Sequence, residues 1–97
     1  MTFRVTKQAE HDLEEIGDFI ALDNRARALS FVMEIEARFA EIAQQPQQFR
    51  LRDEIMPGLR AARHGRYLIF FAVEDAGVVF LRVLHGARDY SRLRLED

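Results

Sequence analysis

The stretch GRYLIFFAVEDAGVVFLRVLHGARDY, residues 65–90, contains two apolar runs separated by a short polar turn. The runs Tyr67–Glu74 and Val78–His85 are rich in β-branched and aromatic residues, which are typical of strands. The intervening Asp75-Ala76-Gly77 has the length of a hairpin loop, with a glycine where a positive φ is needed. The stretch therefore predicts an antiparallel hairpin whose second strand ends at His85-Gly86.

The residues before this hairpin extend the sheet by one strand. Leu59–Arg63 are interpreted as a further strand, and His64-Gly65 makes a turn into the hairpin, so we expect a three-stranded antiparallel meander. Gln44–Gly58 has no clear periodicity and ends on the turn pair Pro57-Gly58, which predicts a long connection. Long loops in small domains are often functional.

The first half of the chain predicts a short strand and two helices. Thr2–Thr6 alternate polar and apolar residues as a strand does, and Thr6 is a candidate N-cap for a helix over Lys7–Leu22. A second helix is expected from a cap at Asp23 to about Ala43, which makes an αα-hairpin. The apolar stripes of the two helices are Ala9, Leu13, Ile16, Ile20 and then Ala28, Phe31, Val32, Ile35, Phe39, Ile42. The fold class is therefore α+β, in a single domain over residues 1–97.

Both faces of the last two strands are apolar. Strict alternation places Phe80 and Leu84 on the face opposite Val79, Leu81 and Val83. One face should pack on the helical hairpin. For the other face we expect either helices wrapped around a strongly curved sheet or a partner protein that supplies the cover.

Composition limits the classes of function. The chain has 97 residues, 48% of them hydrophobic, a net charge of −2 and no cysteine, which excludes disulfides and thiolate chemistry. Residues 1–48 carry nine acids and five bases (net −4), and residues 49–97 carry nine arginines and seven acids (net +2). This balance argues against sequence-independent binding to duplex DNA. With no signal peptide or membrane span evident in the sequence, we expect a cytoplasmic protein.

The predicted hairpin brings polar side chains to one end of the sheet. His85 should lie beside Arg66 and Tyr67, with His64, Arg88 and Tyr90 nearby. Histidine and arginine together can perform acid–base chemistry on a phosphodiester. Alternatively, His85 and Gly86 simply end a strand, and the local sequence by itself favours this structural interpretation. The three histidines lack metal-ligand spacing and no phosphate loop is present, so we expect no metal and no cofactor.

The assembled pattern resembles ParE-type toxins of the RelE/ParE superfamily, the toxic halves of type II toxin–antitoxin modules. The resemblance covers nearly the whole chain. It rests on TKQAEHDLEEIGDFI after the first strand, PGLR at 57–60, GRYLIFFAVEDAG at 65–77 and RVLHGARDY at 82–90. It implies a RelE/ParE-like fold, with a short N-terminal strand, an α-helical hairpin and a three-stranded antiparallel meander in one sheet.

Two contrasting activities follow from the resemblance. ParE-like members poison DNA gyrase and are not themselves enzymes, and we favour this activity, with Arg60, His64, Arg66 and Arg88 as candidate target contacts. RelE-like members cut mRNA on the ribosome without a metal. For that alternative the candidate catalytic residues are Arg66, His85, Arg88 and Tyr90. A third possibility is an inactive member that still binds its antitoxin.

The resemblance also implies a protein partner. We expect a hetero-oligomer with a cognate antitoxin, contact with DNA only through that complex, and no membrane partner. An antitoxin of this kind lays a helix and an extended segment along the toxin. The candidate apolar contacts are Phe19, Phe49, Leu51 and Ile55, whereas Phe31 is assigned to the core.

Overall fold

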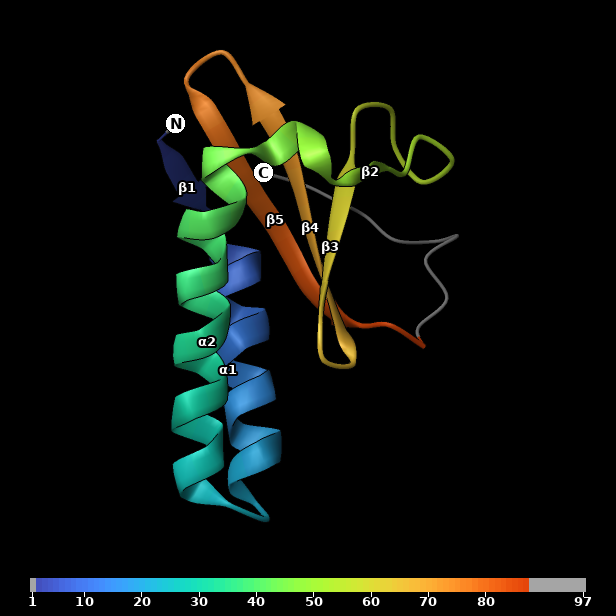
Figure 1. The fold of residues 1–97 in the computed structure, drawn as a ribbon. Coiled ribbons are helices and arrows are strands. Elements are labelled where there is room, and N and C mark those ends of the chain that lie inside the picture. Colours follow the sequence, from blue (N-terminus) through green and yellow to red (C-terminus); the bar gives the residue numbers. More distant parts are fainter. Residues whose placement is uncertain (1, 88–97) are drawn as a thin grey trace.

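The computed structural model of the chain describes residues 2–87 and has an α+β architecture, with a helical hairpin on one side of a twisted sheet (Figure 1). The elements in chain order are β1 (Phe3–Val5), α1 (Lys7–Ala21), α2 (Arg25–Gln44), the 3-10 helix η1 (Pro46–Gln48), β2 (Arg50–Leu51), β3 (Arg60–His64), β4 (Tyr67–Glu74) and β5 (Gly77–His85). None of the helices in the described part of the chain is long and apolar enough to span a membrane.

Within residues 2–87 the sheet has five strands in the order β1-β5-β4-β3-β2. The meander β3–β4–β5 confirms the prediction from the sequence. β1 adds to it by pairing in parallel with β5, and the long stretch of chain between these two strands, which includes both helices, permits the parallel arrangement. β2 lies within Gln44–Gly58, the segment that we expected to be an irregular connection, and it pairs with β3. The expectation was therefore wrong for Arg50 and Leu51.

Both helices begin at a side-chain cap. The Thr6 hydroxyl accepts a hydrogen bond from the Ala9 N–H at 3.1 Å, as predicted. The second helix is capped one residue later than expected, because Asn24 and not Asp23 accepts from the Arg27 N–H, at 3.0 Å. Each cap satisfies a backbone donor that has no partner inside the helix.

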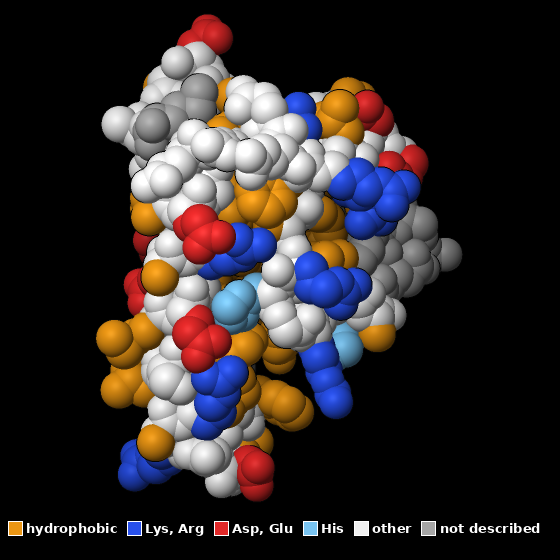
Figure 2. Space-filling view, in the orientation of Figure 1, with side chains coloured by type: hydrophobic (Ala, Val, Ile, Leu, Met, Phe, Trp, Pro, Cys, Tyr) orange, Lys and Arg blue, Asp and Glu red, His pale blue; other side chains and the backbone are white. Residues whose placement is uncertain are grey.

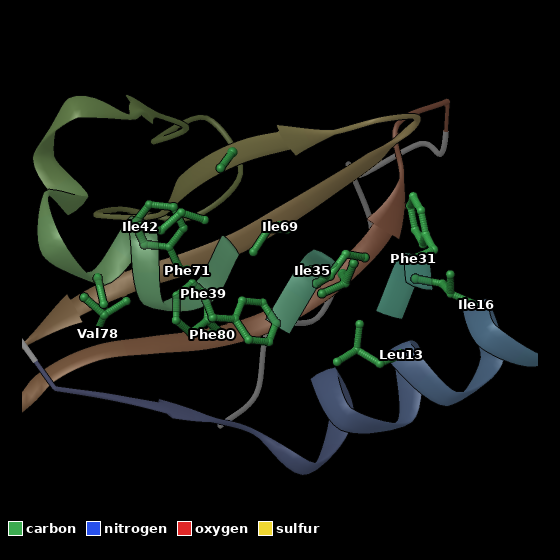
Figure 3. Close-up of a cluster of buried hydrophobic side chains, with 13 residues drawn as sticks. Leu13, Ile16, Phe31, Ile35, Phe39, Ile42, Ile69, Phe71, Val78 and Phe80 are labelled. Carbon is green, nitrogen blue, oxygen red and sulfur yellow. The ribbon is translucent and has the colours of Figure 1, made fainter. Parts of the chain in front are cut away.

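The helical hairpin buries one face of the sheet. Figure 3 shows the apolar stripe of α2 and the inner side of α1 packed against side chains of β4 and β5. Phe39 of α2 stacks on Phe80 of β5 with ring centroids 4.2 Å apart, and Phe31 is buried, as its assignment to the core predicted. These contacts fix the hairpin relative to β5.

The second face of the sheet is also buried within the chain. Its cluster consists of Leu59, Leu68, Phe70, Val79, Leu81 and Leu84. Ile55 and Met56, from the connection between β2 and β3, pack against it. We expected this face to be covered either by helices wrapped around the sheet or by a partner protein. Neither expectation accounts for these contacts, because the connection between β2 and β3 packs apolar side chains against this face.

A β-bulge in β5 breaks the predicted alternation. Phe70 pairs with Arg82 but Phe71 pairs with Phe80, so Leu81 is an extra residue in β5. As a result Phe80 and Val83 both belong to the cluster under the helices, while Leu84 belongs to the opposite cluster. The prediction that Phe80 and Leu84 share a face was therefore wrong, because a single extra residue reverses every side chain after it.

The turn between β4 and β5 depends on a glycine. Gly77 has φ 141°, and a Cβ there would lie 2.2 Å from the Thr2 carbonyl oxygen. That oxygen accepts a hydrogen bond from the Val78 N–H at 2.9 Å, which begins the pairing of β1 with β5. The glycine predicted for this turn thus also makes room for the N-terminal strand.

Candidate functional site

The ends of β4 and β5 meet as the sequence predicted. Tyr67 pairs with His85, and their rings contact edge to face with centroids 5.5 Å apart. The Gly86 N–H donates to the Arg66 carbonyl oxygen at 2.7 Å, which continues the pairing one residue beyond the strand. His85, Arg66 and Tyr67 are therefore neighbours at one end of the sheet.

The bulge that leads to this end is fixed by α1. Asp12 is 5% exposed and its carboxylate accepts two hydrogen bonds from Arg82, at 2.8 and 3.0 Å, and one from the Val83 N–H at 2.9 Å. The Thr6 hydroxyl donates to the Leu81 carbonyl oxygen at 3.0 Å. Hydrogen bonding to Asp12 raises the pKa of Arg82, so the guanidinium stays charged. Asp12 of α1 and Thr6, the N-cap of that helix, thus satisfy backbone groups that the bulge removes from the strand pairing.

The bulge sets the face on which His85 lies. Because Leu81 is the extra residue, His85 comes to the same side as Tyr67, which packs against the cluster under the helices. There a hollow of about 200 Å³ opens between α1 and the end of the sheet, and we call it the sheet-end pocket. It is lined by Asp12, Glu15, Ile16, Phe19, Tyr67, Val83, Leu84 and His85. The lining combines the aromatic rings of Phe19, Tyr67 and His85 with two carboxylates, of which Asp12 is buried and paired with Arg82.

His64 lies at the same end of the sheet but contacts α2. Its Nε2 is 3.1 Å from Glu34 Oε1, and its ring is 5.4 Å from that of Phe31. Glu34 also accepts from Arg27, whose guanidinium lies 5.0 Å from the Phe31 ring centroid. The hydrogen bonds from Arg27 and then His64 lower the pKa of Glu34. Figure 2 shows pale-blue histidine surface on this side of the molecule, with acidic and basic side chains around it.

The remaining predicted basic residues are in different environments. Arg60 is half-buried and donates to the Phe49 carbonyl oxygen at 2.6 Å, so it holds the segment around β2. Arg66 is exposed in the turn between β3 and β4. Arg88 and Tyr90 lie outside the described residues. Of the proposed nuclease set, the structure therefore brings together Arg66 and His85.

The chemistry available at His85 is limited by its Nδ1, which accepts a hydrogen bond from the Ala87 N–H at 3.1 Å. While this bond holds, Nδ1 cannot take a proton from a substrate. Among residues 2–87, no group of three histidine or acidic side chains is arranged to hold a metal ion.

The candidate antitoxin contacts do not form one patch. Phe19 is 69% exposed on α1 and lines the sheet-end pocket. Leu51 is 43% exposed on β2, the far edge of the sheet. Phe49 is half-buried against Phe71, and Ile55 packs on the second face. A partner that covers all four must reach across the sheet.

Sequence reasoning missed Asp12, which organises this site. The signal was present, because Asp12 lies within the apolar stripe of α1, between Ala9 and Ile16, where a helix buries its side chains. A carboxylate at such a position requires buried donors. Arg82, an isolated charge in an apolar strand, was the matching signal.

Comparisons with known proteins agree with this architecture. A family model described as the ParE toxin of the type II toxin–antitoxin system parDE matches residues 3–90. A chain of the chromosomal ParDE toxin–antitoxin system from P. aeruginosa is similar in structure, with 25% identity, a TM-score of 0.75, and coverage of 88% of this chain and 95% of that one. A chain of the RelBE2 toxin–antitoxin complex from Mycobacterium tuberculosis has 30% identity, a TM-score of 0.55, and coverage of 87% and 95%. The search among curated proteins found no match.

Proposed function

Since the chain belongs to the family of ParE toxins of type II toxin–antitoxin systems, we propose that it poisons DNA gyrase and that a cognate antitoxin neutralises it by direct binding. The observation that carries the proposal is the family match over residues 3–90, which includes both the helical hairpin and the sheet. The likeness to the ParDE chain, with its TM-score of 0.75 against 0.55 for the RelBE2 chain, supports the same branch. In this proposal the protein acts in the cytoplasm, where gyrase works.

The internal contacts of the basic side chains also support binding to a protein target rather than cleavage of RNA. Arg82 is paired with the buried Asp12, and Arg60 donates to backbone carbonyl groups. His64 is held by Glu34. A metal-independent nuclease needs cations free to stabilise charge on phosphate. These three side chains are already engaged with the protein itself.

Ribosome-dependent cleavage of mRNA is the second candidate function. The exposed Arg66 beside His85 favours it, together with the 30% identity to the RelBE2 chain. Under this alternative Arg88 and Tyr90 complete the catalytic set. The two functions differ in their target, so purified components distinguish them.

A gyrase cleavage assay tests the proposal. The purified protein is incubated with gyrase, ATP and supercoiled plasmid, and linear DNA is scored after detergent and protease. We expect linear DNA that depends on gyrase, and less of it with Arg66→Ala if the sheet end contacts the target. Arg50→Ala, which removes an equal charge from an exposed position on β2, away from this end of the sheet, is the matched control. No linear DNA at saturating protein contradicts the proposal, and cleavage of ribosome-bound mRNA in a parallel assay would establish the alternative.

The proposed neutralisation by a cognate antitoxin is tested in cells. Expression of the chain alone should arrest growth, and co-expression of the adjacent small open reading frame should relieve the arrest. Normal growth, with the soluble chain binding that second product, would identify an inactive antitoxin-binding member. Phe19→Ser and Leu51→Ser, compared in the same copurification, report which exposed side chain the antitoxin covers.

A further inference from the structure

Two arginines at the end of the sheet keep their charges free. Arg63 on β3 and Arg66 in the turn to β4 are both exposed, and neither forms an ion pair within residues 2–87. Five other arginines in this part of the chain pair with a carboxylate; they are Arg4, Arg27, Arg38, Arg52 and Arg82. The charges of Arg63 and Arg66 are therefore available to a ligand, and we call these two residues the arginine pair.

Both members of the arginine pair lie on the second face of the sheet, the one opposite the helical hairpin. Arg63 pairs with Leu68, which belongs to the apolar cluster on that face. Paired residues on neighbouring strands point to the same side, so Arg63 shares the face of Leu68. Arg66 precedes Leu68 by two residues, and the alternation of side chains gives it the same direction. The two side chains thus extend from one face.

Gly86 lets the side chain of Arg63 approach Arg66. A Cβ at position 86 would lie 3.5 Å from Arg63 Nη1 and 3.7 Å from Nη2, so the guanidinium takes space that a larger residue would fill. The Gly86 N–H donates to the Arg66 carbonyl oxygen at 2.7 Å, which puts Gly86 directly opposite Arg66. The Cβ positions of directly opposite residues are about 5 Å apart. Arg63 therefore carries its charge to within reach of the Arg66 side chain.

The φ angle of Gly86 does not explain why a glycine stands there. The described glycines with a positive φ are Gly58, Gly65 and Gly77, so the backbone at position 86 suits other residues. A Cβ at position 86 would, however, lie 3.2 Å from the Arg66 carbonyl oxygen as well as beside the Arg63 guanidinium. What glycine permits at this position is the close approach of these groups.

Two unpaired cations at this separation favour a shared anion. Like charges this close repel each other, and an anion between them offsets the repulsion. Each guanidinium presents five N–H donors in a planar fork. One fork satisfies a carboxylate, whereas the oxygens of a phosphate group accept from two forks at once. We propose that the arginine pair binds a phosphodiester group of a nucleic acid strand.

The position of the arginine pair favours binding without cleavage. His85, the candidate acid–base group, lies on the side of Tyr67, which packs against the cluster under the helices. Acid–base catalysis requires a side chain within hydrogen-bond reach of the reacting group. A phosphate held by Arg63 and Arg66 lies on the opposite face, so the pair contributes affinity and orientation.

The inference rests on the proposed function only for the origin of the strand. Gyrase holds DNA and the ribosome holds mRNA, so either target presents phosphodiester groups. The net charge of −2 keeps the affinity modest, because acids elsewhere in the chain repel a polyanion. Binding of a bare oligonucleotide tests the arginine pair without a target protein. Its failure would therefore leave the gyrase assay and the growth assay unaffected.

The test measures fluorescence anisotropy of a short labelled oligothymidylate with the full chain at low salt. A methylphosphonate oligomer of the same sequence lacks the negative charge of each linkage and is the matched probe. We expect the phosphodiester oligomer to bind at least tenfold more tightly. The logarithm of its affinity should fall by about 0.7 for each tenfold rise in salt and each phosphate contact. Inorganic phosphate and a glutamate peptide, at the same concentration of anionic groups, should not displace it.

Variants decide whether the oligonucleotide binds at the arginine pair. Arg63→Ala/Arg66→Ala should weaken binding at least tenfold and reduce its dependence on salt. Gly86→Leu changes no charge but puts a side chain where the Arg63 guanidinium lies, and it should also weaken binding. The matched control Arg25→Ala/Arg50→Ala removes the same charge from two exposed sites, on α2 and β2, and should leave affinity unchanged. Circular dichroism confirms the fold of each variant.

Several results would overturn the proposal. One is the absence of binding, and another is equal affinity for the phosphodiester and methylphosphonate oligomers. Undiminished binding by Arg63→Ala/Arg66→Ala, or an equal loss in the matched control, would show that the arginine pair is not the site. Displacement by inorganic phosphate would assign the pair to a free phosphate, and displacement by the glutamate peptide would assign it to an acidic protein segment.

Discussion

Two carboxylates connect the helical hairpin to the sheet, one buried and one exposed. Asp12 on α1, with 6% of its side chain exposed, binds Arg82 and the Val83 N–H at the bulge of β5. Glu34 on α2, with 42% of its side chain exposed, binds Arg27 and the His64 ring at the end of β3. Both bring together segments far apart in the sequence, yet water is excluded around the first and has access to the second.

The difference in burial determines what each carboxylate contributes. Removing Asp12 would leave a largely buried guanidinium and a backbone N–H without an acceptor, and the cost of such unpaired groups is high. Removing Glu34 would let water solvate both of its partners, Arg27 and His64. Because these ion pairs are exposed, dissolved salt also weakens them by screening their charges. Asp12 therefore stabilises the bulged conformation of β5, whereas Glu34 only helps to position the end of β3.

The largest effect should come from Asp12→Ala. We expect it to lower the free energy of unfolding by about 3–5 kcal/mol, the usual cost of removing one partner from a buried ion pair. Urea denaturation at neutral pH measures this change. The control is Glu15→Ala, on the same helix, whose partner His11 is exposed and whose loss should have no measurable effect. Equal stability of the two variants would contradict the structural role of Asp12.

A smaller effect should follow from Thr6→Val. The hydroxyl both caps α1 and donates to the Leu81 carbonyl oxygen, and valine keeps the shape without either bond. We expect a loss of about 1–2 kcal/mol, from the missing cap and a buried carbonyl left unpaired. Thr6→Ser restores the hydroxyl and should recover most of the stability in the same urea titration. A Thr6→Val variant as stable as the unsubstituted protein would contradict the contribution of these two hydrogen bonds.

The comparison also explains how far the sequence could predict the fold. Helical and strand periodicities identified α1, α2 and the meander, because those patterns follow from local geometry. The neighbourhood of His85 and Tyr67 followed from the hairpin turn. Caps were predicted to within one residue, since Asp23 and Asn24 are both good cap residues and only the backbone decides between them.

The bulge and its consequences could not be predicted by periodicity. An extra residue in β5 is compatible with apolar side chains on both faces, so Leu81 carried no signal of its own. The bulge is visible only when Asp12 and Arg82, 70 residues apart, are considered together. β2 was missed for a related reason, because two residues are too few for alternation to show.

The smallest effect should come from Glu34→Gln, and its dependence on pH and salt separates the two carboxylates. At neutral pH we expect a smaller change than for Thr6→Val, because the pair is exposed. The folded pKa of Glu34 is lowered below its usual value of 4.5, by Arg27 and then His64, so its contribution to stability is present above pH 4.5 and is lost as the pH falls through the folded pKa. The stability difference between Glu34→Gln and the unsubstituted protein should therefore shrink below that pH.

In about 1 M salt, where the screening length is about 3 Å, the difference should vanish for Glu34→Gln but persist for Asp12→Ala. Urea titrations across pH and salt measure both trends, and a salt-sensitive Asp12→Ala would mean that water reaches the bulge.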